Sequence, residues 1–435
     1  MSACDRTSQE FSPAHFMHIR RLLRQNACMN EGAPSEAAEK PPELWQFVPL
    51  SAYAQPELAA SSAAVAAWGS FTKFFRSVHK EDMVPVKQED ALRSLPGVLL
   101  EHLVGHIDWR KASAALDTAL SAQGSDAASS VQFLIGQPHC GHAEMVADWA
   151  ARHDAQIIEP PSYEALLANN GQWRVAWPAQ GQAWALPALE RCFLRSATGL
   201  ALLRNLLEEI VSGRAGRGLV GCDSWAWAYL QRISSLPLPL ALTLQAFDGP
   251  RMSRLLAQLA DTGGQGQLLF RNARSGQTTL TVPYDGDAAS DEVVQLAAHC
   301  RGNVGVARCY WRQRLRAVSD SAAELNEAGS GAPEKTDPDA EVIWVSATQP
   351  ESALPIEADE DVALVLHALL LHNGLSADVL TSVLPLPRHL CMAIVLRLQR
   401  LTLLEQYEGR WRVSALGYEL VRRWLRGRGF LIDDF

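Results

Sequence analysis

The segment from Val131 to His153 constrains the fold of this chain more than any other. An apolar run, VQFLI, comes directly before the loop Gly136-Gln-Pro-His-Cys-Gly-His-Ala143, and the loop opens into the amphipathic stretch AEMVADWAARH. In a phosphate-binding loop, two glycines five positions apart let backbone N–H groups wrap an anion at a helix N-terminus. The pattern therefore predicts a parallel α/β sheet covered by helices, with residues 136–143, called the glycine loop below, at one end of a strand.

Two positions of the glycine loop differ from a working phosphate loop. His142 stands where a lysine neutralises phosphate charge, and Ala143 stands where a hydroxyl holds magnesium. A neutral imidazole supplies less charge than an ammonium, and a methyl group cannot bind a metal ion. We expect Mg-ATP hydrolysis to be crippled or absent; the alternative reading is an accidental loop in another α/β sheet. The candidate nucleotide-binding residues of the loop are Gly136, Gln137, Pro138, His139, Cys140, Gly141, His142 and Ala143.

Short apolar runs alternate with helical stretches up to about residue 262. Strands are expected at 131–135, 156–158, 184–189, 218–222 and 240–244, and helices at 143–153, 161–168, 198–212, 224–234 and 250–261. Before this region, apolar residues recur at spacings of three and four around Leu92 to Leu103 and Trp109 to Leu120, which predicts a helical lead-in.

Composition divides the chain into further parts. Residues 318–341 hold seven acidic side chains against the single Lys335, a composition typical of a linker. The expected domains are a loose segment at 1–43, a helical lead-in at 44–125, the α/β domain at 126–262, a hairpin and helical lid at 263–317, an acidic linker at 318–341 and a winged helix at 342–435.

The winged-helix prediction rests on the order of elements after the linker. Helices are expected at 361–372, 376–384 and 388–401, followed by strands at 403–407 and 410–413 and a last helix capped by Ser414. Arg388, Arg397, Arg400 and Arg410 are the candidate DNA or partner contacts. From Glu360 onward nine arginines face eight acidic residues, so the module is nearly neutral, and we favour protein contact over DNA contact.

These features together resemble the P-loop NTPases of the AAA+ and STAND groups, including the branch that ends in a winged helix, as the replication-origin initiator ATPases do. The resemblance covers about Trp109 to Phe435. It implies that Glu190, after the run WALPAL, is the only remaining candidate for the acid that holds magnesium and activates water. It also implies a phosphate sensor at Asp223, whose other reading is a helix cap, and a phosphate contact at Arg301, whose other reading is a solvated arginine.

Charge and cysteine usage exclude several classes. The formal charge of -9 argues against general polyanion binding, and the eight cysteines have no CxxC spacing, which fits a reducing cytoplasm. His139, Cys140 and His142 are neighbours, but three ligands on one tight loop rarely share a metal and no fourth is evident, so we predict no zinc site. We also expect no signal peptide and no membrane span, and therefore a cytoplasmic protein.

Three functional hypotheses follow. The first is a non-hydrolysing regulatory or scaffolding protein of NTPase fold that acts through protein partners. The second is a switch that binds ATP or ADP, or a weak ATPase in which Glu190 is the catalytic acid. The third is a DNA-binding regulator whose α/β part is a platform. The sequence names neither the partner nor the oligomeric state.

Overall fold

The chain divides into two compact units, residues 1–42 and 43–435. The computed structural model describes residues of the second unit only: 43–56, 87, 91–122, 131–168, 173, 177–178, 181–196, 198–234, 239–260, 267–284, 286, 288–318, 340–348 and 352–435. The expected loose segment, apart from Glu43, and nearly all of the expected acidic linker lie outside the described residues.

The glycine loop belongs to a six-stranded sheet of order β1-β7-β3-β6-β5-β4. Five of its strands are parallel, and β1 pairs with β7 in the antiparallel sense. A mixed α/β fold with a parallel sheet is therefore confirmed. The strands are β1 (Phe47–Pro49), β3 (Val131–Gly136), β4 (Gln156–Ile157), β5 (Trp184–Leu186), β6 (Gly218–Asp223) and β7 (Ala241–Leu244).

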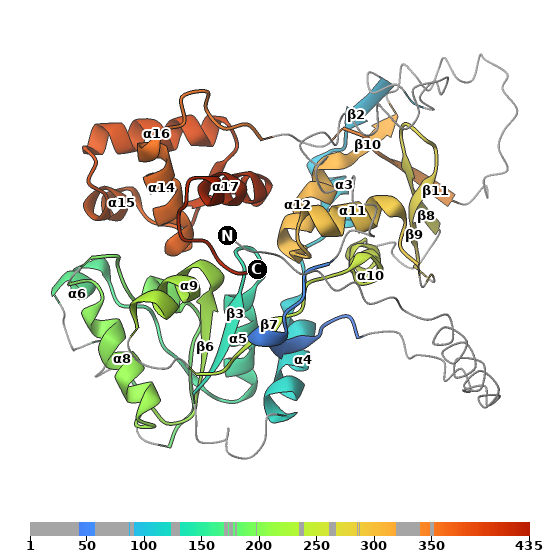
Figure 1. The fold of residues 1–435 in the computed structure, drawn as a ribbon. Helices are drawn as coiled ribbons and strands as arrows, with labels where there is room; N and C mark the ends of the chain where they lie inside the picture. Colours follow the sequence, from blue (N-terminus) through green and yellow to red (C-terminus); the bar gives the residue numbers. More distant parts are fainter. Residues whose placement is uncertain are drawn as a thin grey trace, which may run out of the picture. The chain divides into compact units, whose positions relative to one another are not determined.

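Helices cover both faces of this sheet (Figure 1). Leu134 packs in one core cluster with residues of α4 and α5, whereas Phe133 and Ile135 pack in a second cluster with residues of α8 and α9. Successive side chains of a strand point to opposite faces, so an uninterrupted apolar strand needs a cover on each side. The elements around the sheet are η1 (Leu50–Ala52), α4 (Trp109–Ala122), α5 (His142–Arg152), α6 (Tyr163–Ala168), η5 (Leu189–Arg191), α8 (Ala201–Val211) and α9 (Ser224–Ile233).

A second sheet has the order β2-β10-β11-β8-β9 and mixes parallel and antiparallel pairs. Its strands are β2 (Leu92–Ser94), β8 (Gln267–Asn272), β9 (Thr278–Val282), β10 (Leu315–Val318) and β11 (Ala340–Val345). Helices α3 (Gly97–Leu103), α10 (Gly249–Leu259), α11 (Asp291–His299) and α12 (Val304–Arg314) accompany it.

Only the β8–β9 hairpin of this sheet was expected from the sequence. Residues 92–94 form a strand instead of the start of a helix, because Pro96 places a fixed break directly before α3. Residues 315–318 form β10 instead of continuing the lid helix, and residues 342–345, assigned above to the winged helix, lie in β11 beside β8. Each of these short strands takes its partner from a distant part of the chain, which local periodicity does not reveal.

The last part of the chain follows the expected order closely. Helices α14 (Glu360–Leu371), α15 (Ala377–Val383) and α16 (Arg388–Arg400) precede the hairpin β12 (Leu404–Tyr407) and β13 (Arg410–Val413), and α17 (Ala415–Gly427) follows. Asp359, Ser376 and Ser414 cap three of the helices by accepting backbone N–H groups. Among the described helices, none has the length and apolar character needed to cross a membrane.

Candidate functional site

The glycine loop lies where a doubly wound sheet binds ligands. It follows β3, which is flanked by β6 on one side and β7 on the other, so the chain crosses to opposite sides of the sheet around this strand. His139 and Gly141 both adopt left-handed backbone angles, with φ of 69° and 66°. At Gly141 an added Cβ would lie 2.1 Å from the Trp109 ring, so this position requires glycine sterically as well as conformationally.

The predicted site residues His142, Glu190 and Asp223 lie together beside the glycine loop, each near the carboxyl end of a different strand. The His142 Nε2 and Glu190 Oε1 atoms are 3.7 Å apart, which is an ion-pair distance longer than a hydrogen bond. The second Glu190 carboxylate oxygen accepts the backbone N–H of Asp223 at 3.1 Å. All three side chains are buried, with exposed fractions of 3%, 1% and 0%. His142, Glu190 and Asp223 thus lie together in the structure.

The charges of this cluster are coupled. Burial alone would lower the pKa of His142 and raise that of Glu190, but each acts on the other, so that the pKa of His142 is raised and that of Glu190 is lowered. Burial, and then the neighbouring Glu190 charge, raise the pKa of Asp223 well above its usual range. These shifts favour an imidazolium–carboxylate pair of His142 and Glu190 and the protonated form of Asp223. Asp223 also caps α9 by accepting the N–H of Trp225 at 3.0 Å, so the helix-cap reading holds.

The space inside the glycine loop is nearly filled. A cavity of about 10 Å³ remains there, lined by Gly136, Gln137, Cys140, His142 and Phe435 among others. This volume holds about one water molecule, far less than a phosphate group needs. Phe435 is 3% exposed, and its ring lies 4.7 Å from that of Tyr53. Gln137 of the loop donates to the Tyr53 hydroxyl at 2.9 Å, so loop and cover are bonded together.

Two arginines hold the segment that carries Phe435. Arg422 of α17 donates to Asp433 Oδ1 at 2.8 Å and to the Phe435 carbonyl oxygen at 2.5 Å. Arg301, the predicted phosphate contact, donates to the same carbonyl oxygen. Ser224 and Tyr418 complete the surroundings by donating to Asp433 Oδ2 at 2.5 and 3.3 Å. Arg301 therefore binds the chain's own 430–435 segment and is not a solvated arginine.

The outer side of the glycine loop packs against α12. Asn303 caps this helix and also donates to the Pro138 carbonyl oxygen at 2.9 Å. At Gly305 a Cβ would lie 1.9 Å from the His139 carbonyl oxygen, so only glycine allows this approach. His139 Nε2 lies 3.1 Å from the Val413 carbonyl oxygen of β13, and burial lowers its pKa to about 3. The loop is thus fixed from the lid and from the C-terminal module.

These contacts do not fit Mg-ATP. The loop encloses too little space for phosphates, Ala143 offers no ligand, and Glu190 is engaged by His142 and the Asp223 N–H. No group of three or more His, Cys, Asp or Glu side chains suited to a metal ion occurs within the described residues. Four buried polar atoms around the loop have no hydrogen-bond partner within that part: His142 Nδ1 and Nε2, Glu190 Oε1 and Asp223 Oδ2.

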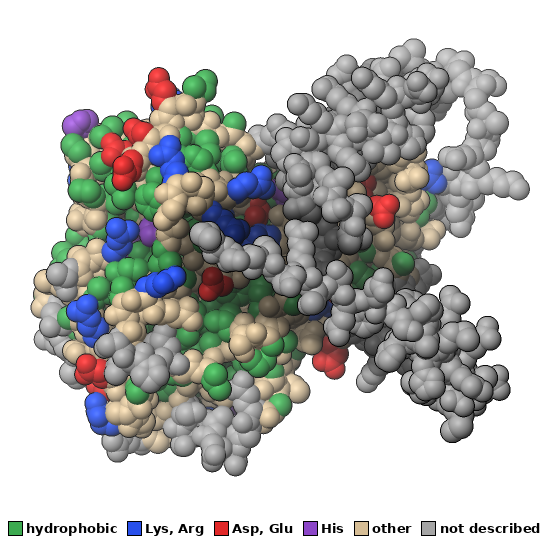
Figure 2. Space-filling view, in the orientation of Figure 1, with side chains coloured by type: hydrophobic (Ala, Val, Ile, Leu, Met, Phe, Trp, Pro, Cys, Tyr) green, Lys and Arg blue, Asp and Glu red, His purple; other side chains and the backbone are tan. Residues whose placement is uncertain are grey.

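The four predicted DNA or partner arginines do not share one surface. Arg388, Arg397 and Arg400 are exposed on α16, where Arg388 pairs with Asp378 at 2.8 Å and Arg397 with Glu357 at 3.9 Å. Arg410, at the β12–β13 turn, is half-buried and lines a cavity together with Arg191 of η5. In the space-filling view, basic side chains lie along the line where the C-terminal module meets the α/β sheet domain (Figure 2).

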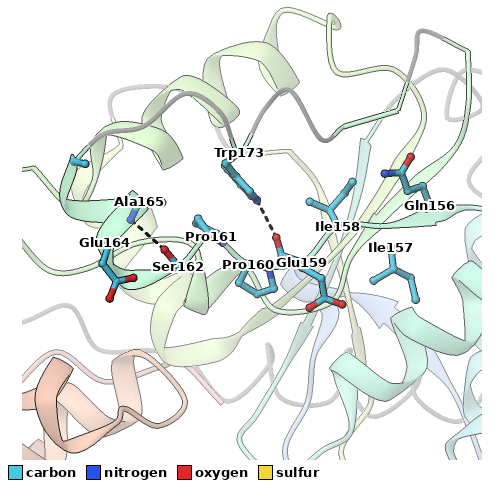
Figure 3. A pocket seen from close by; sticks show the side chains of 11 residues that line it. Gln156, Ile157, Ile158, Glu159, Pro160, Pro161, Ser162, Glu164, Ala165 and Trp173 are labelled. Carbon is cyan, nitrogen blue, oxygen red and sulfur yellow. Dashed lines mark hydrogen bonds between the residues drawn. The ribbon is translucent and has the colours of Figure 1, made fainter.

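A separate groove of about 600 Å³ lies beside β4, the edge strand of the first sheet (Figure 3). Gln156 and Ile158 donate their backbone N–H groups toward β5, so the backbone N–H and C=O groups of Ile157 between them point away from the sheet. The Ile157 side chain is 42% exposed. The Trp173 indole closes one side by donating to the Glu159 carbonyl oxygen at 2.8 Å. Ile158, Pro160, Pro161, Ala165 and Ala168 add apolar surface, with Glu164 at the rim.

Several residues of the site were not predicted from the sequence: Tyr53, Arg191, Asn303, Arg422, Asp433 and Phe435. Most are far from the glycine loop in sequence, and the 430–435 segment carries no motif. The capping role of Asn303 could have been predicted, since Asn directly before an apolar helical stretch indicates a helix N-cap. Nothing local reveals that the same amide also holds the loop.

Comparisons with known proteins add little. No protein-family model matches this chain, and no curated protein matches it. The solved structures include a match to a Drosophila origin recognition complex (ORC) chain in the structure of ORC bound to DNA, with 11% sequence identity, a TM-score of 0.32, and coverage of 83% of this chain and 100% of that one. A TM-score this low carries no argument about fold or function.

Proposed function

We propose that this chain is a non-hydrolysing regulatory or scaffolding protein of the AAA+/STAND-like NTPase type, which acts through protein partners. One observation carries the proposal. The glycine loop is filled by the chain itself, with a His142–Glu190 ion pair where magnesium chemistry would be needed and with Phe435 against the loop. Because Glu190 already pairs with His142 and Phe435 lies against the loop, the loop has no room for the phosphates of a nucleotide.

The strand arrangement supports the same family type. One strand, β6, separates the loop strand β3 from β5, whose end carries Glu190, which is the arrangement that the AAA+ resemblance implies. The order α14-α15-α16-β12-β13-α17 supports a winged helix as the last module. In this reading the NTPase-type domain is a rigid platform, and Tyr53, Arg301 and Arg422 hold the platform and the winged helix in one arrangement.

The groove beside β4 supports a protein partner. The outer edge of β4, which pairs with no further strand among the described residues, adjoins this apolar groove. Such an edge fits an extended peptide that adds a strand, since backbone hydrogen bonds give affinity and alternate side chains fill the groove. Glu159 and Glu164 are exposed beside it, and hydrogen bonds from its own backbone and then from Ser162 lower the pKa of Glu164. The fitting partner is an extended segment with apolar residues next to Lys or Arg.

The test is calorimetric titration of the full chain with ATP and ADP, with and without magnesium. The wild type should give no heat from the loop and no Mg-dependent turnover. The variant His142→Lys, Ala143→Thr restores the missing residue types, and combining it with Phe435→Ala removes the cover as well. Binding by the triple variant alone supports a vestigial loop, whereas wild-type turnover abolished by Glu190→Gln would overturn the proposal.

A nucleotide switch is the second candidate, and the buried polar atoms without partners favour it. Displacement of Phe435 would leave His142, Glu190 and Asp223 facing a larger space, in which those atoms could meet a ligand. In this case wild-type protein binds ATP or ADP, and Phe435→Ala tightens the binding by removing a competing group. Equal or weaker binding by Phe435→Ala would remove the switch.

A DNA-binding regulator is the third candidate, favoured by the exposed arginines on α16. It requires duplex binding that weakens with rising salt and that falls on Arg397→Ala with Arg400→Ala. The matched control is Arg422→Lys, because Arg422 is buried and cannot reach DNA. If no salt-sensitive duplex binding is found, this candidate is removed.

A further inference from the structure

A cavity of about 430 Å³ lies between the C-terminal module and the carboxyl end of β5. It is called the arginine cavity below. Arg191 lines it from η5, Arg410 from the β12–β13 turn, and His372 from the residue after α14, with Tyr163 and Ser376 at its sides. Glu190 also borders it, so the cavity adjoins the closed glycine loop without being part of it.

Arg191 and Arg410 both line this cavity, and the nearby carboxylates of Glu190 and Glu408 favour the charged form of Arg410 without pairing with it directly. Within the described part of the chain, neither Arg191 nor Arg410 forms an ion pair, and Arg191 Nε is buried without a hydrogen-bond partner. Both guanidinium groups line the same cavity, and burial, and next the charge of Arg191, lower the pKa of Arg410. Bringing like charges together in a half-buried place costs free energy unless an anion joins them.

The acidic residues of the cavity do not supply that anion. Glu190 is committed to His142 at 3.7 Å and to the backbone N–H of Asp223 at 3.1 Å. Glu159 and Glu408 line the cavity too, but both are exposed, and neither forms an ion pair with Arg191 or Arg410. Their charges are therefore largely screened by water, whereas the guanidinium groups are partly desolvated.

His372 adds a requirement for the ligand. It is 2% exposed, and its Nδ1 lies 3.3 Å from the Glu190 carbonyl oxygen. Because a carbonyl oxygen only accepts, Nδ1 carries the hydrogen, and burial lowers the ring's pKa to about 4, so the ring is neutral. The other nitrogen, Nε2, is then an acceptor, and it has no partner among the described residues.

We propose that the arginine cavity binds the phosphate group of a small phosphate ester. Arg191 and Arg410 donate to the charged oxygens, and His372 Nε2 accepts from a hydroxyl of the same ligand. Guanidinium groups match phosphate oxygens in geometry and charge, and the volume is that of an ordinary small-molecule site. A phosphate ester meets both demands because it joins a dianion to hydroxyl donors. This site is independent of the function proposed for the glycine loop.

The test is calorimetry of the full chain with AMP, ribose 5-phosphate, inorganic phosphate and sulfate as separate probes. Either Arg191→Gln or Arg410→Gln should weaken phosphate-ester binding by about tenfold or more, since each removes a charge-assisted contact. Arg388→Gln is the matched control, because this exposed arginine pairs with Asp378 and neither residue lines the cavity, and it should change nothing. Tighter AMP than ribose 5-phosphate indicates a nucleotide, and equal affinities indicate that only the sugar phosphate is bound.

Sulfate separates the role of His372 from charge alone. Sulfate has no hydrogen to donate at neutral pH, so it should bind more weakly than inorganic phosphate, and His372→Phe should remove this difference. Absence of binding by all phosphate probes at about 10 mM overturns the proposal, and so does binding that both arginine variants leave unchanged. Melting temperatures guard against misfolding, because a bound ester raises the melting temperature of the wild type but not of a folded Arg191→Gln protein.

Discussion

The glycine loop and the arginine cavity both border Glu190, yet they solve the problem of charge in opposite ways. At the loop the chain provides an ion pair, a helix cap and Phe435 as a cover, and about 10 Å³ of space remains. In the arginine cavity two guanidinium groups face about 430 Å³ without a carboxylate partner in the described chain. The comparison shows that the open space and the arginines without an ion-pair partner lie beside the glycine loop and not within it.

The strongest test of the closed loop is removal of the residue that anchors its cover. Arg422→Leu removes the ion-pair partner that Asp433, which is 2% exposed, has among the described residues. We expect a loss of about 3–5 kcal/mol in the free energy of unfolding, the usual cost of breaking a buried ion pair. Urea denaturation measures it. The neighbouring Arg423→Leu is the control, since Arg423 is exposed, and should stay within about 0.5 kcal/mol. Equal losses in both variants would show that the segment is not anchored by Arg422.

Phe435→Ala tests the cover itself. Truncating this buried ring should lower the free energy of unfolding by about 3–5 kcal/mol and admit solvent to the loop cavity, which Cys140 also lines. Burial raises the pKa of the Cys140 thiol to about 12, so its alkylation in the wild type should be very slow. We expect iodoacetamide to alkylate Cys140 at least about tenfold faster in the variant than in the wild type. Peptide mass spectrometry measures the two rates. Cys192, buried elsewhere in the sheet domain, is the internal control, and a parallel rise there would indicate general unfolding instead.

The two histidines that contact Glu190 should give opposite pH dependences. His372 has a folded pKa of about 4, below its unfolded value near 6.5, so stability falls as pH drops from 6.5 toward 4, by roughly 2–3 kcal/mol. His142 has a raised folded pKa, so its stabilisation is complete below pH 6.5 and is lost as pH rises through the folded value. The measurement is the urea midpoint from pH 4 to 9. The variant His372→Asn should reduce the loss of stability toward acid pH, and His142→Asn should reduce the loss toward alkaline pH. The same slope change from both variants would contradict the assigned charges.

Sequence reasoning succeeded where the signal was local. The apolar strand before Gly136, the caps at Ser376 and Ser414, and the helix after Asp223 could be predicted because neighbours in sequence determine them. The resemblance to NTPases also named Glu190 and Asp223 as candidate site residues, and both lie beside His142 in the structure. What could not be predicted depends on distant pairs, such as Phe435 with Tyr53, or Arg191 with Arg410. Conversely, the resemblance named Arg301 as a phosphate contact, and the winged-helix order named Arg410 as a DNA or partner contact. Neither pattern shows which of them faces another part of the same chain.

The smallest effects should come from the exposed face of α16, which neither site uses. The Arg388–Asp378 pair is exposed by 71% and 75%, and water and salt screen such pairs strongly. Asp378→Asn should therefore change the free energy of unfolding by no more than about 0.5 kcal/mol and leave phosphate-ester binding unaltered. A large loss of ester affinity in this variant would mean that the field of the whole module, and not direct contact with Arg191 and Arg410, attracts the anion. Measuring the affinity at two salt concentrations separates these cases, because a contact between half-buried groups weakens less with salt than a long-range field does.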